Sequence, residues 1–387
     1  MYLTYCAYLA LTICLMGSLW RICRWFTVSI GPEASATSPG RRFVTACRAV
    51  MSALFGPRLL RIVGTLIADV LLQRRIARQS LLRWLMHMGL LYGVFILVAT
   101  HALDDMIMVH LFGDYASTLN PYMVLRNLAA FLLMAGVVIA FIRRKKNAVL
   151  KRFSNRADRL PLVLLALILL SGIALEAVQI ISAPIFEEMV VDYMGEEDSE
   201  ATAALQAFWA AHYDVVFESP PANDAATLYQ GSALHKAYCA ECHSHPGSAF
   251  VSYPVAHLLK PLSDLPAQAR IDIWLWQVHY LVSCLALAYL PFGKLFHLVS
   301  VPVSLAVQSV GAARDNIPDN LPARRAMGLD ACTHCGVCSR HCSVAPIMAV
   351  IDNPTILPSE KTGAVATMAT DRMAPAQRWP QPKAGQS

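Results

Sequence analysis

The chain has few charged side chains. Asp, Glu, Lys and Arg make up 15% of its 387 residues, whereas soluble domains average roughly 25%. Hydrophobic residues make up 56% and the mean hydropathy is +0.46. Because the apolar residues gather in blocks, this composition excludes an ordinary soluble domain and indicates a membrane protein. The net charge of +6 does not indicate nucleic-acid binding, because the basic residues cluster beside the apolar blocks instead of forming one stripe.

The chain also has no internal repeat, and its eleven cysteines do not have the character of a secreted disulfide scaffold. Five cysteines are scattered, mostly in or beside apolar segments, where cysteine is usually a small buried hydrophobe. They are Cys6, Cys14, Cys23, Cys47 and Cys284. The remaining six fall into two short motifs, which we therefore take as the candidate cofactor sites.

Five segments are long and apolar enough to cross a bilayer, which takes about 20 residues. They are Tyr2–Trp20, Trp84–Leu103, Pro121–Ile142, Leu160–Ile181 and Ile271–Phe292. The first has no basic residues before it and no small-residue cleavage site, so we expect a retained helix and not a signal peptide.

The distribution of Arg and Lys predicts the orientation. Basic residues are concentrated between the first and second spans and between the third and fourth, which places both segments inside. The N-terminus is then outside and the C-terminus inside. Segment 182–270, whose first part is acidic, is outside as well. Within the first inner segment, Leu59–Leu72 predicts an amphipathic helix on the inner surface. Residues 351–387 are rich in Pro, Ala, Thr and Gln, which favours a flexible tail.

Four histidines lie at membrane depth, where ionisable residues are rare and usually functional. His87 and His101 are 14 residues apart in the second span, and His279 and His297 are 18 apart in or just beyond the fifth. At about 100° per residue, each pair lies on one face of its helix. Antiparallel pairing places His87 beside His297 near the inner face and His101 beside His279 near the outer face. Two haem b sites, each with two histidine ligands, are predicted.

The outer segment contains Cys239-Ala-Glu-Cys242-His243, the C-x-x-C-H pattern of covalent c-type haem attachment. The two thiols would form thioethers, and His243 would bind the iron. The motif lies on the predicted outer side, where bacterial c-type haem is attached. For the sixth iron ligand we take His257 first; five-fold coordination remains open. The alternative ligands are His212, His235, Met189 and Met194.

Cys332, Cys335, Cys338 and Cys342 have the C-x2-C-x2-C-x3-C spacing of a bacterial ferredoxin. Gly336 would allow the tight turn. The proline that usually follows the fourth cysteine is replaced by Ser343, and the chain has no second cysteine run. One [4Fe–4S] cluster held by all four thiolates is the simpler prediction; in the alternative, Cys342 serves a cluster shared with a partner.

Over about residues 1–310 the arrangement resembles the gamma-subunit family of respiratory nitrate reductase, in particular the cytochrome b subunits of heterodisulfide-reductase-like and sulfite-reductase-associated membrane complexes. The resemblance rests on the five spans, the paired histidines and the segment His297-Leu-Val-Ser-Val-Pro302. It implies two b haems, quinone as the lipid-phase partner, and an iron–sulfur or catalytic subunit inside. The outer c-haem segment and the cysteine tail depart from the simple nitrate reductase subunit, so nitrate reduction is poorly supported.

The sequence therefore predicts an all-α membrane protein with five transmembrane helices, an outer c-haem loop and a small cytoplasmic [4Fe–4S] segment. Its expected parts are 1–181 (spans one to four), 182–270 (outer loop), 271–312 (span five and extension), 313–350 (cluster segment) and 351–387 (tail).

The expected function is transmembrane electron transfer in a bacterial cytoplasmic membrane. It would link the quinone pool and the c haem, with an outer-face cytochrome c as a further partner, to a cytoplasmic iron–sulfur subunit. Glu176, in the fourth span, is the candidate for quinone proton handling, ahead of Arg126, Asp104 and Lys294, which lie near span ends. The alternatives are a quinone-independent conduit between soluble carriers and, last, a membrane redox sensor.

Overall fold

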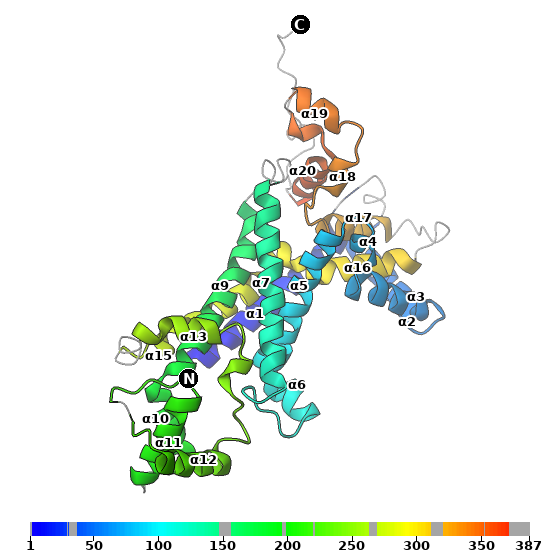
Figure 1. Ribbon diagram of the computed structural model, residues 1–387. Coiled ribbons are helices and arrows are strands. Elements are labelled where there is room, and N and C mark those ends of the chain that lie inside the picture. The colour runs from blue at the N-terminus through cyan, green and yellow to red at the C-terminus, as the bar shows by residue number, and fades with distance from the viewer. Residues whose placement is uncertain are drawn as a thin grey trace. The chain divides into compact units, whose positions relative to one another are not determined.

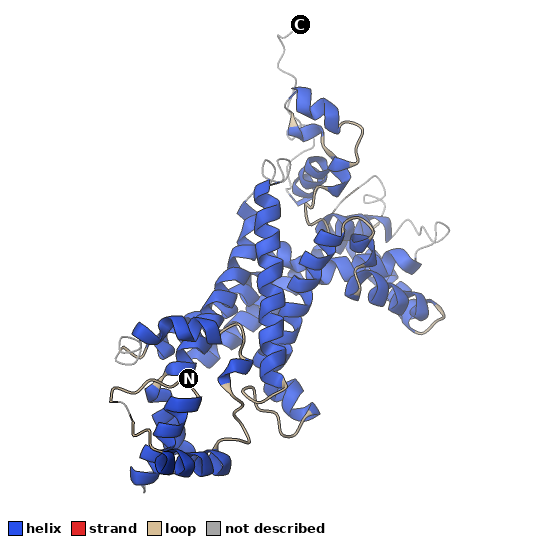
Figure 2. Cartoon of the chain, viewed as in Figure 1, coloured by secondary structure: helices blue, strands red, loops and turns tan. Residues whose placement is uncertain are grey.

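The computed structural model describes residues 2–28, 30, 37–146, 156–195, 199–219, 221–262, 269–310, 320–351 and 353–370. Within these ranges the chain is helical and contains no strand, apart from an isolated bridge between Ser182 and Val216 (Figures 1 and 2). Five helices are long and apolar enough to cross a membrane, which confirms the five predicted spans. They are Leu3–Thr27, Leu81–Ala102, Tyr122–Lys146, Arg156–Ile181 and Ile271–Phe292.

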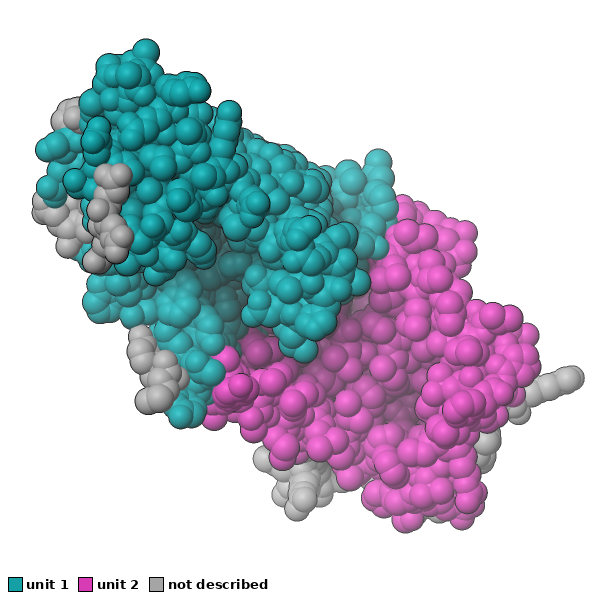
Figure 3. Space-filling model, turned by 90° about the horizontal axis from the view of Figure 1, so that it is seen from below, with its two compact units in different colours: residues 1–6, 80–143, 162–286 teal, residues 7–79, 144–161, 287–387 magenta. Residues whose placement is uncertain are grey.

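The chain forms two compact units, which are coloured separately in Figure 3. Unit 1 comprises residues 1–6, 80–143 and 162–286. Unit 2 comprises residues 7–79, 144–161 and 287–387.

In unit 1, helix α5 (Leu81–Leu97) packs closely on α7 (Tyr122–Lys146) because its contact face carries glycines. Gly89 and Gly93 form a G-x-x-x-G pair, and a Cβ on Gly89 would lie 2.6 Å from the carbonyl oxygen of Leu132 on α7. Such small residues let membrane helices approach each other. Leu133 and Val137 of α7 then pack against Leu169 of α9 (Arg156–Ile181). The resulting helix packing is what positions the membrane histidines of this unit.

The segment of unit 1 that is predicted to lie outside the membrane, named the outer segment for that reason, is a set of short helices that follows α9 directly. They are α10 (Ala183–Tyr193), α11 (Ser199–His212), α12 (Ala225–Tyr238), η4 (Pro246–Ser248), α13 (Tyr253–Leu259) and η5 (Lys260–Leu262), and span helix α15 (Ile271–Tyr289) comes next (Figure 1). Gly231 lets α12 approach α11: a Cβ there would lie 2.1 Å from the carbonyl oxygen of Ala204. The core of this segment is Phe186, Val190, Leu205, Trp209 and Val215.

Unit 2 contains most of α1 (Tyr2–Thr27), followed by α2 (Pro39–Leu54), α3 (Arg58–Thr65), η2 (Leu66–Leu71) and α4 (Arg74–Ala77). The predicted helix over Leu59–Leu72 is present as α3 and η2. It forms a pair with α2 that is bent by 91°, and the two together would count as a sixth, broken span if the bent pair crossed the membrane. Arg42 of α2 is 2% exposed and donates to the carbonyl oxygens of Phe26 and Val28, each at 3.0 Å.

The last span does not continue as one helix. The α15 helix ends at Tyr289 and is followed by η6 (Leu290–Phe292), η7 (Lys294–Phe296) and α16 (His297–Val310). Pro291 and Gly293 account for this break, because a proline removes a helical hydrogen bond and Gly293 follows in an extended conformation. In unit 2, α17 (Leu321–Asp330) is anchored to α1 by Asp330, which accepts from Arg21 at 2.6 Å and from Trp25 at 2.9 Å.

The segment after residue 351 differs from the predicted flexible tail. It contains η10 (Pro354–Ile356) and α20 (Pro358–Thr370), which follow α18 (Val337–Arg340) and α19 (Ala345–Ile351). Leu357 is 1% exposed, and the Ser359 amide donates to Ser339 Oγ at 3.0 Å. The tail composition indicated flexibility, but this packing orders it through residue 370; residues 371–387 lie outside the described part of the chain.

Candidate functional site

His101 and His279 lie side by side in unit 1. Their ring centroids are 6.1 Å apart and the ring planes differ by 49°. An imidazole nitrogen lies about 2.0–2.1 Å from zinc, and a similar bond length to iron places two imidazoles on one metal ion with their ring centres roughly 6 Å apart. The pairing of these two histidines, which belong to spans far apart in the sequence, thus has the spacing that a shared haem iron requires.

Local structure sets the direction of both histidine side chains. His101 belongs to η3 (Val98–Ala102), a π-helical turn at the end of α5. Such turns change the direction of a side chain and are frequent at functional sites. His279 on α15 has Nδ1 3.1 Å from the carbonyl oxygen of Ile168 and 3.0 Å from Ser171 Oγ. A metal-binding histidine usually donates its other ring N–H to such an acceptor, which here would leave Nε2 for the iron.

The second histidine pair is split between the units. His87 belongs to unit 1 and His297 to unit 2, so its pairing stays a prediction. The structure does correct one step of the argument: His279 and His297 do not share one continuous helix, since His297 begins α16 after the break. His297 Nδ1 lies 2.6 Å from the carbonyl oxygen of Lys294, the same kind of second contact as at His279.

The C-x-x-C-H motif begins where α12 ends. Cys239 is the C-terminal cap of α12, and its amide donates to the carbonyl oxygen of His235 at 2.9 Å. Burial, followed by the neighbouring Cys242, raises the pKa of Cys239 to about 11, so this thiol is protonated at neutral pH. Burial lowers the pKa of His243, which keeps its imidazole neutral and its lone pair available for a metal.

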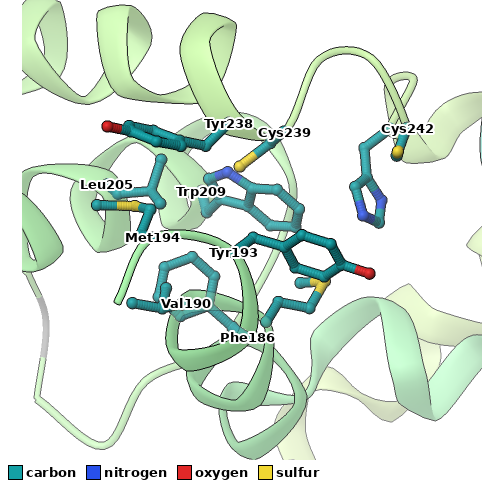
Figure 4. A pocket seen from close by; sticks show the side chains of 11 residues that line it. Phe186, Val190, Tyr193, Met194, Leu205, Trp209, Tyr238, Cys239 and Cys242 are labelled. Carbon is teal, nitrogen blue, oxygen red and sulfur yellow. The ribbon is translucent and has the colours of Figure 1, made fainter. Parts of the chain in front are cut away.

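All three motif residues line an apolar cavity of unit 1 (Figure 4). Figure 4 shows Cys239 across the cavity from Val190 and Phe186 of α10, with Trp209 of α11 between them. The other lining residues are Met189, Tyr193, Met194, Leu205 and Tyr238.

Trp209 provides a test of fit for haem. It is 5% exposed, and its Nε1–H has no hydrogen-bond partner among the residues that the structure describes. An unpaired buried donor is costly, and a haem bears two propionate carboxylates that can accept from such a donor. The side chains around the cavity also suit haem. The thiols of Cys239 and Cys242, the neutral imidazole of His243 and the thioethers of Met189 and Met194 face a pocket that is otherwise aromatic and aliphatic.

The predicted sixth ligand, His257, does not line this cavity. Its Nε2 lies 3.5 Å from Asp214 Oδ2, and its ring packs on Tyr253. His235 Nε2 is 2.8 Å from the hydroxyl of Tyr213, and His212 is exposed against Phe208. Of the five sixth-ligand candidates, the structure brings only Met189 and Met194 to the cavity.

The loop between α6 (Asp104–Leu111) and α7 joins the C-x-x-C-H motif to the outer histidine. Thr118 Oγ1 donates to the carbonyl oxygen of Cys242 at 2.6 Å, and its own carbonyl accepts from the Ser244 amide at 3.0 Å. In the same loop, the Tyr115 hydroxyl donates to the carbonyl oxygen of Thr100, the neighbour of His101. The two candidate haem sites of unit 1 are therefore tied to one short loop.

The carboxylate of Glu176 takes part in a polar cluster. It lies 3.6 Å from the guanidinium of Arg126 and accepts from Ser252 Oγ. Arg126 also donates to the carbonyl oxygen of Ser117 at 2.9 Å. Glu176 therefore connects α9 with α7 and the outer segment. Of the other two quinone candidates, Lys294 pairs with Asp158, and Asp104 lies in the first turn of α6.

The four-cysteine run is less organised. Gly336 has φ +72°, as the tight turn requires. Cys332, Cys335 and Cys338 are exposed. No group of three or more His, Cys, Asp or Glu side chains with metal-site geometry occurs in the described part of the chain. The cluster remains a prediction, and no step is derived through it.

Sequence reasoning missed Trp209 and the ion cluster at Asp214. Asp214 accepts from Lys260 and from the Tyr253 hydroxyl. Nothing in the sequence near Trp209 signals an unpaired indole, and the partners of Asp214 lie on helices that only the fold brings together.

The chain was compared with protein-family models, with curated proteins and with solved structures, and none of them matches it.

Proposed function

We propose that this chain is the electron-transfer subunit of a membrane oxidoreductase. It would carry electrons between a c-type haem outside, b haems within the bilayer and a cytoplasmic iron–sulfur partner, with the quinone pool as its lipid-phase partner. The observation that carries the proposal is the His101–His279 pair. The centroids of the two rings are 6.1 Å apart, and the two histidines belong to two different candidate membrane helices. A structural role explains this pair poorly, since polar side chains at membrane depth are costly unless they serve a site.

The residues of the chain supply what the cofactors need. Bound haem contributes an iron that accepts and releases one electron; the protein contributes ligands, spacing and exclusion of water. In unit 1, His101 and His279 would hold the outer b haem, and the contact of His279 with Ile168 would fix the tautomer that presents Nε2. Cys239, Cys242 and His243 would hold the c haem in the cavity lined by Trp209 and Phe186. The loop that joins the two sites supports a direct exchange between them.

The inner half of the proposed pathway rests on the sequence. His87 and His297 would hold the second b haem, and the four cysteines would hold one [4Fe–4S] cluster next to the partner subunit. The basic segments indicate a bacterial cytoplasmic membrane with the N-terminus outside and the C-terminus inside.

The first experiment is an optical spectrum of the detergent-purified chain, with pyridine haemochrome quantification of haem b and haem c. Two haem b and one haem c per chain are expected. The His279→Ala variant should lose one haem b and keep the covalent haem c. His110→Ala is the matched control, because His110 is bound to the carbonyl oxygen of Asp105 in its own helix. A His279→Ala protein with both b haems would refute the assignment, as would a native chain without haem b.

The contacts of Glu176 favour a second candidate, a conduit between soluble carriers that does not use quinone. A carboxylate already paired with Arg126 and Ser252 is poorly placed to exchange protons with a quinone. If Glu176→Gln left quinol-dependent haem reduction unchanged, Glu176 would have no role in proton handling. If a quinol analogue also shifted no haem b spectrum, the conduit would be the better description.

A further inference from the structure

We propose that the thioether of Met189 is the sixth ligand of the haem c iron. This inference rests on the proposed c-type haem at Cys239 and Cys242. It replaces the histidine that the sequence favoured with a methionine of the first helix after span four.

The composition of the cavity wall limits which groups can bind the haem iron. Apart from the two motif cysteines and the phenols of Tyr193 and Tyr238, three lining side chains offer an atom that can bind iron: His243, Met189 and Met194. A phenol binds ferric iron as the phenolate, so it must first lose a proton, whereas a thioether binds without losing one. Both methionines come from the stretch of α10 and its C-terminal cap that forms one wall of the cavity. A neutral, polarisable thioether can be buried in such an apolar wall at little cost.

Each nearby histidine has contacts elsewhere. His257 faces the carboxylate of Asp214, and His235 bonds to the Tyr213 hydroxyl. His245 Nδ1 accepts from the Gly247 amide at 3.0 Å. None of these three side chains lines the cavity, and neither does the exposed His212. Recruiting one of them would require breaking its contact and moving the segment that carries it.

Met189 and Met194 differ in their position relative to α10. Phe186, Met189, Val190 and Tyr193 recur at the three- and four-residue spacing that puts them on one face of α10. Ser182 caps this helix, its Oγ accepting from the Ile185 amide at 3.4 Å, so Met189 is held on a regular helical face. Met194 lies beyond the helix as its cap. Figure 4 shows the Met194 side chain beside Leu205 and Tyr238, at the end of the cavity away from Cys242.

Aromatic contacts connect the two proposed axial ligands. The ring of His243 meets Trp209 edge-on at 5.5 Å, and Trp209 is 5.5 Å from Phe186. Phe186 lies one turn before Met189 on the same helix face. His243, in the irregular segment after α12, and Met189, on α10, therefore both border the space around Trp209 and Phe186. Histidine–methionine ligation raises the reduction potential of a haem, which would favour electron flow from a b haem with two histidine ligands to this c haem.

The test uses the full chain, produced with its haems and purified in detergent. Ferric haem with a methionine ligand has a weak sulfur-to-iron charge-transfer band at the red end of the visible spectrum. We expect this band in the native protein and its loss in Met189→Leu, while pyridine haemochrome still shows one covalent haem c. Met189→His should give a six-coordinate haem without the band and with a lower potential. Met194→Leu, the matched control, should keep the band.

The outcomes separate this inference from the proposed function. A native chain with covalent haem c but without the band would overturn the methionine ligand and leave the c-haem site intact. So would a Met189→Leu protein that keeps the band. Loss of the band in Met194→Leu alone would move the ligand to Met194 and refute Met189. A native chain without covalent haem would instead contradict the proposed function itself.

Discussion

The C-x-x-C-H motif and the four-cysteine run are both compact in the sequence, but they have different surroundings in the fold. The first follows a 14-residue helix, faces an apolar cavity and is hydrogen-bonded to another loop through Thr118. The second occupies short turns, with three of its cysteines exposed. Its main ties are the bonds from Ser339 to Ser359 and from His334 to Glu360, at 2.7 and 2.6 Å.

This difference indicates two ways of building a cofactor site. In unit 1, a packed core around Phe186 and Trp209 shapes the site without help from the cofactor. In unit 2, the local structure near the cysteines depends on a few polar contacts, so binding of the cluster and folding of the segment are expected to be coupled. The two motifs should therefore respond differently when a cysteine is removed.

The largest expected effect follows from that contrast. Cys242→Ser should abolish stable double attachment of haem c, but α10–α12 should stay as resistant to protease as in the native chain. Cys335→Ser should make residues 331–351 readily cleaved, because the segment loses its cluster. Limited proteolysis with mass spectrometry measures both, and Cys47→Ser, an exposed cysteine outside the motifs, is the control. Equal cleavage of both regions in both variants would contradict the contrast.

A second substitution tests whether helix packing alone shapes the outer site. An added Cβ at Gly231 would lie 2.1 Å from the Ala204 carbonyl oxygen and 2.7 Å from Phe208 Cβ. Gly231→Ala should therefore push α12 from α11, destabilise the outer segment by about 1–3 kcal/mol and lower the yield of covalent haem c. Gly113→Ala is the matched control, since nothing lies within 4 Å of a Cβ there. Unchanged thermal unfolding and haem content in Gly231→Ala would show that the cavity is not fixed by this contact.

The sequence predicted the features that depend on periodicity. Apolar blocks located the five spans, and the helical repeat combined with antiparallel topology brought His101 to His279. It did not predict features that depend on tertiary contacts. The apolar pattern did not show the break after Tyr289, and α20 was missed because Leu357 burial, and not local propensity, supports it. His257 was favoured as a ligand because its pairing with Asp214 cannot be read from spacing.

The smallest expected effect concerns the ion cluster that keeps His257 away from the cavity. Asp214 is partly buried, which raises its pKa, but hydrogen bonds from Lys260 and Tyr253 outweigh burial and hold the pKa below its usual 3.8. Because the folded pKa lies below the unfolded value, the ionised carboxylate stabilises the fold above about pH 4, and this contribution is lost as the pH falls through the folded pKa. Asp214→Asn should cost about 0.5–1.5 kcal/mol at neutral pH and remove this part of the acid sensitivity.

Thermal unfolding of the outer segment at neutral and acidic pH measures the effect. Asp224→Asn is the control with the same loss of charge in the same segment: Asp224 caps α12, and asparagine caps a helix equally well. The positive φ of Asp214, 67°, is also tolerated by asparagine, so a loss of stability in Asp214→Asn would come from the charge and its partners, not from the backbone. If both variants unfolded like the native chain at both pH values, the cluster would not hold His257 in place. A histidine ligand would then become available to the haem c iron, so this measurement also bears on the choice between His257 and Met189.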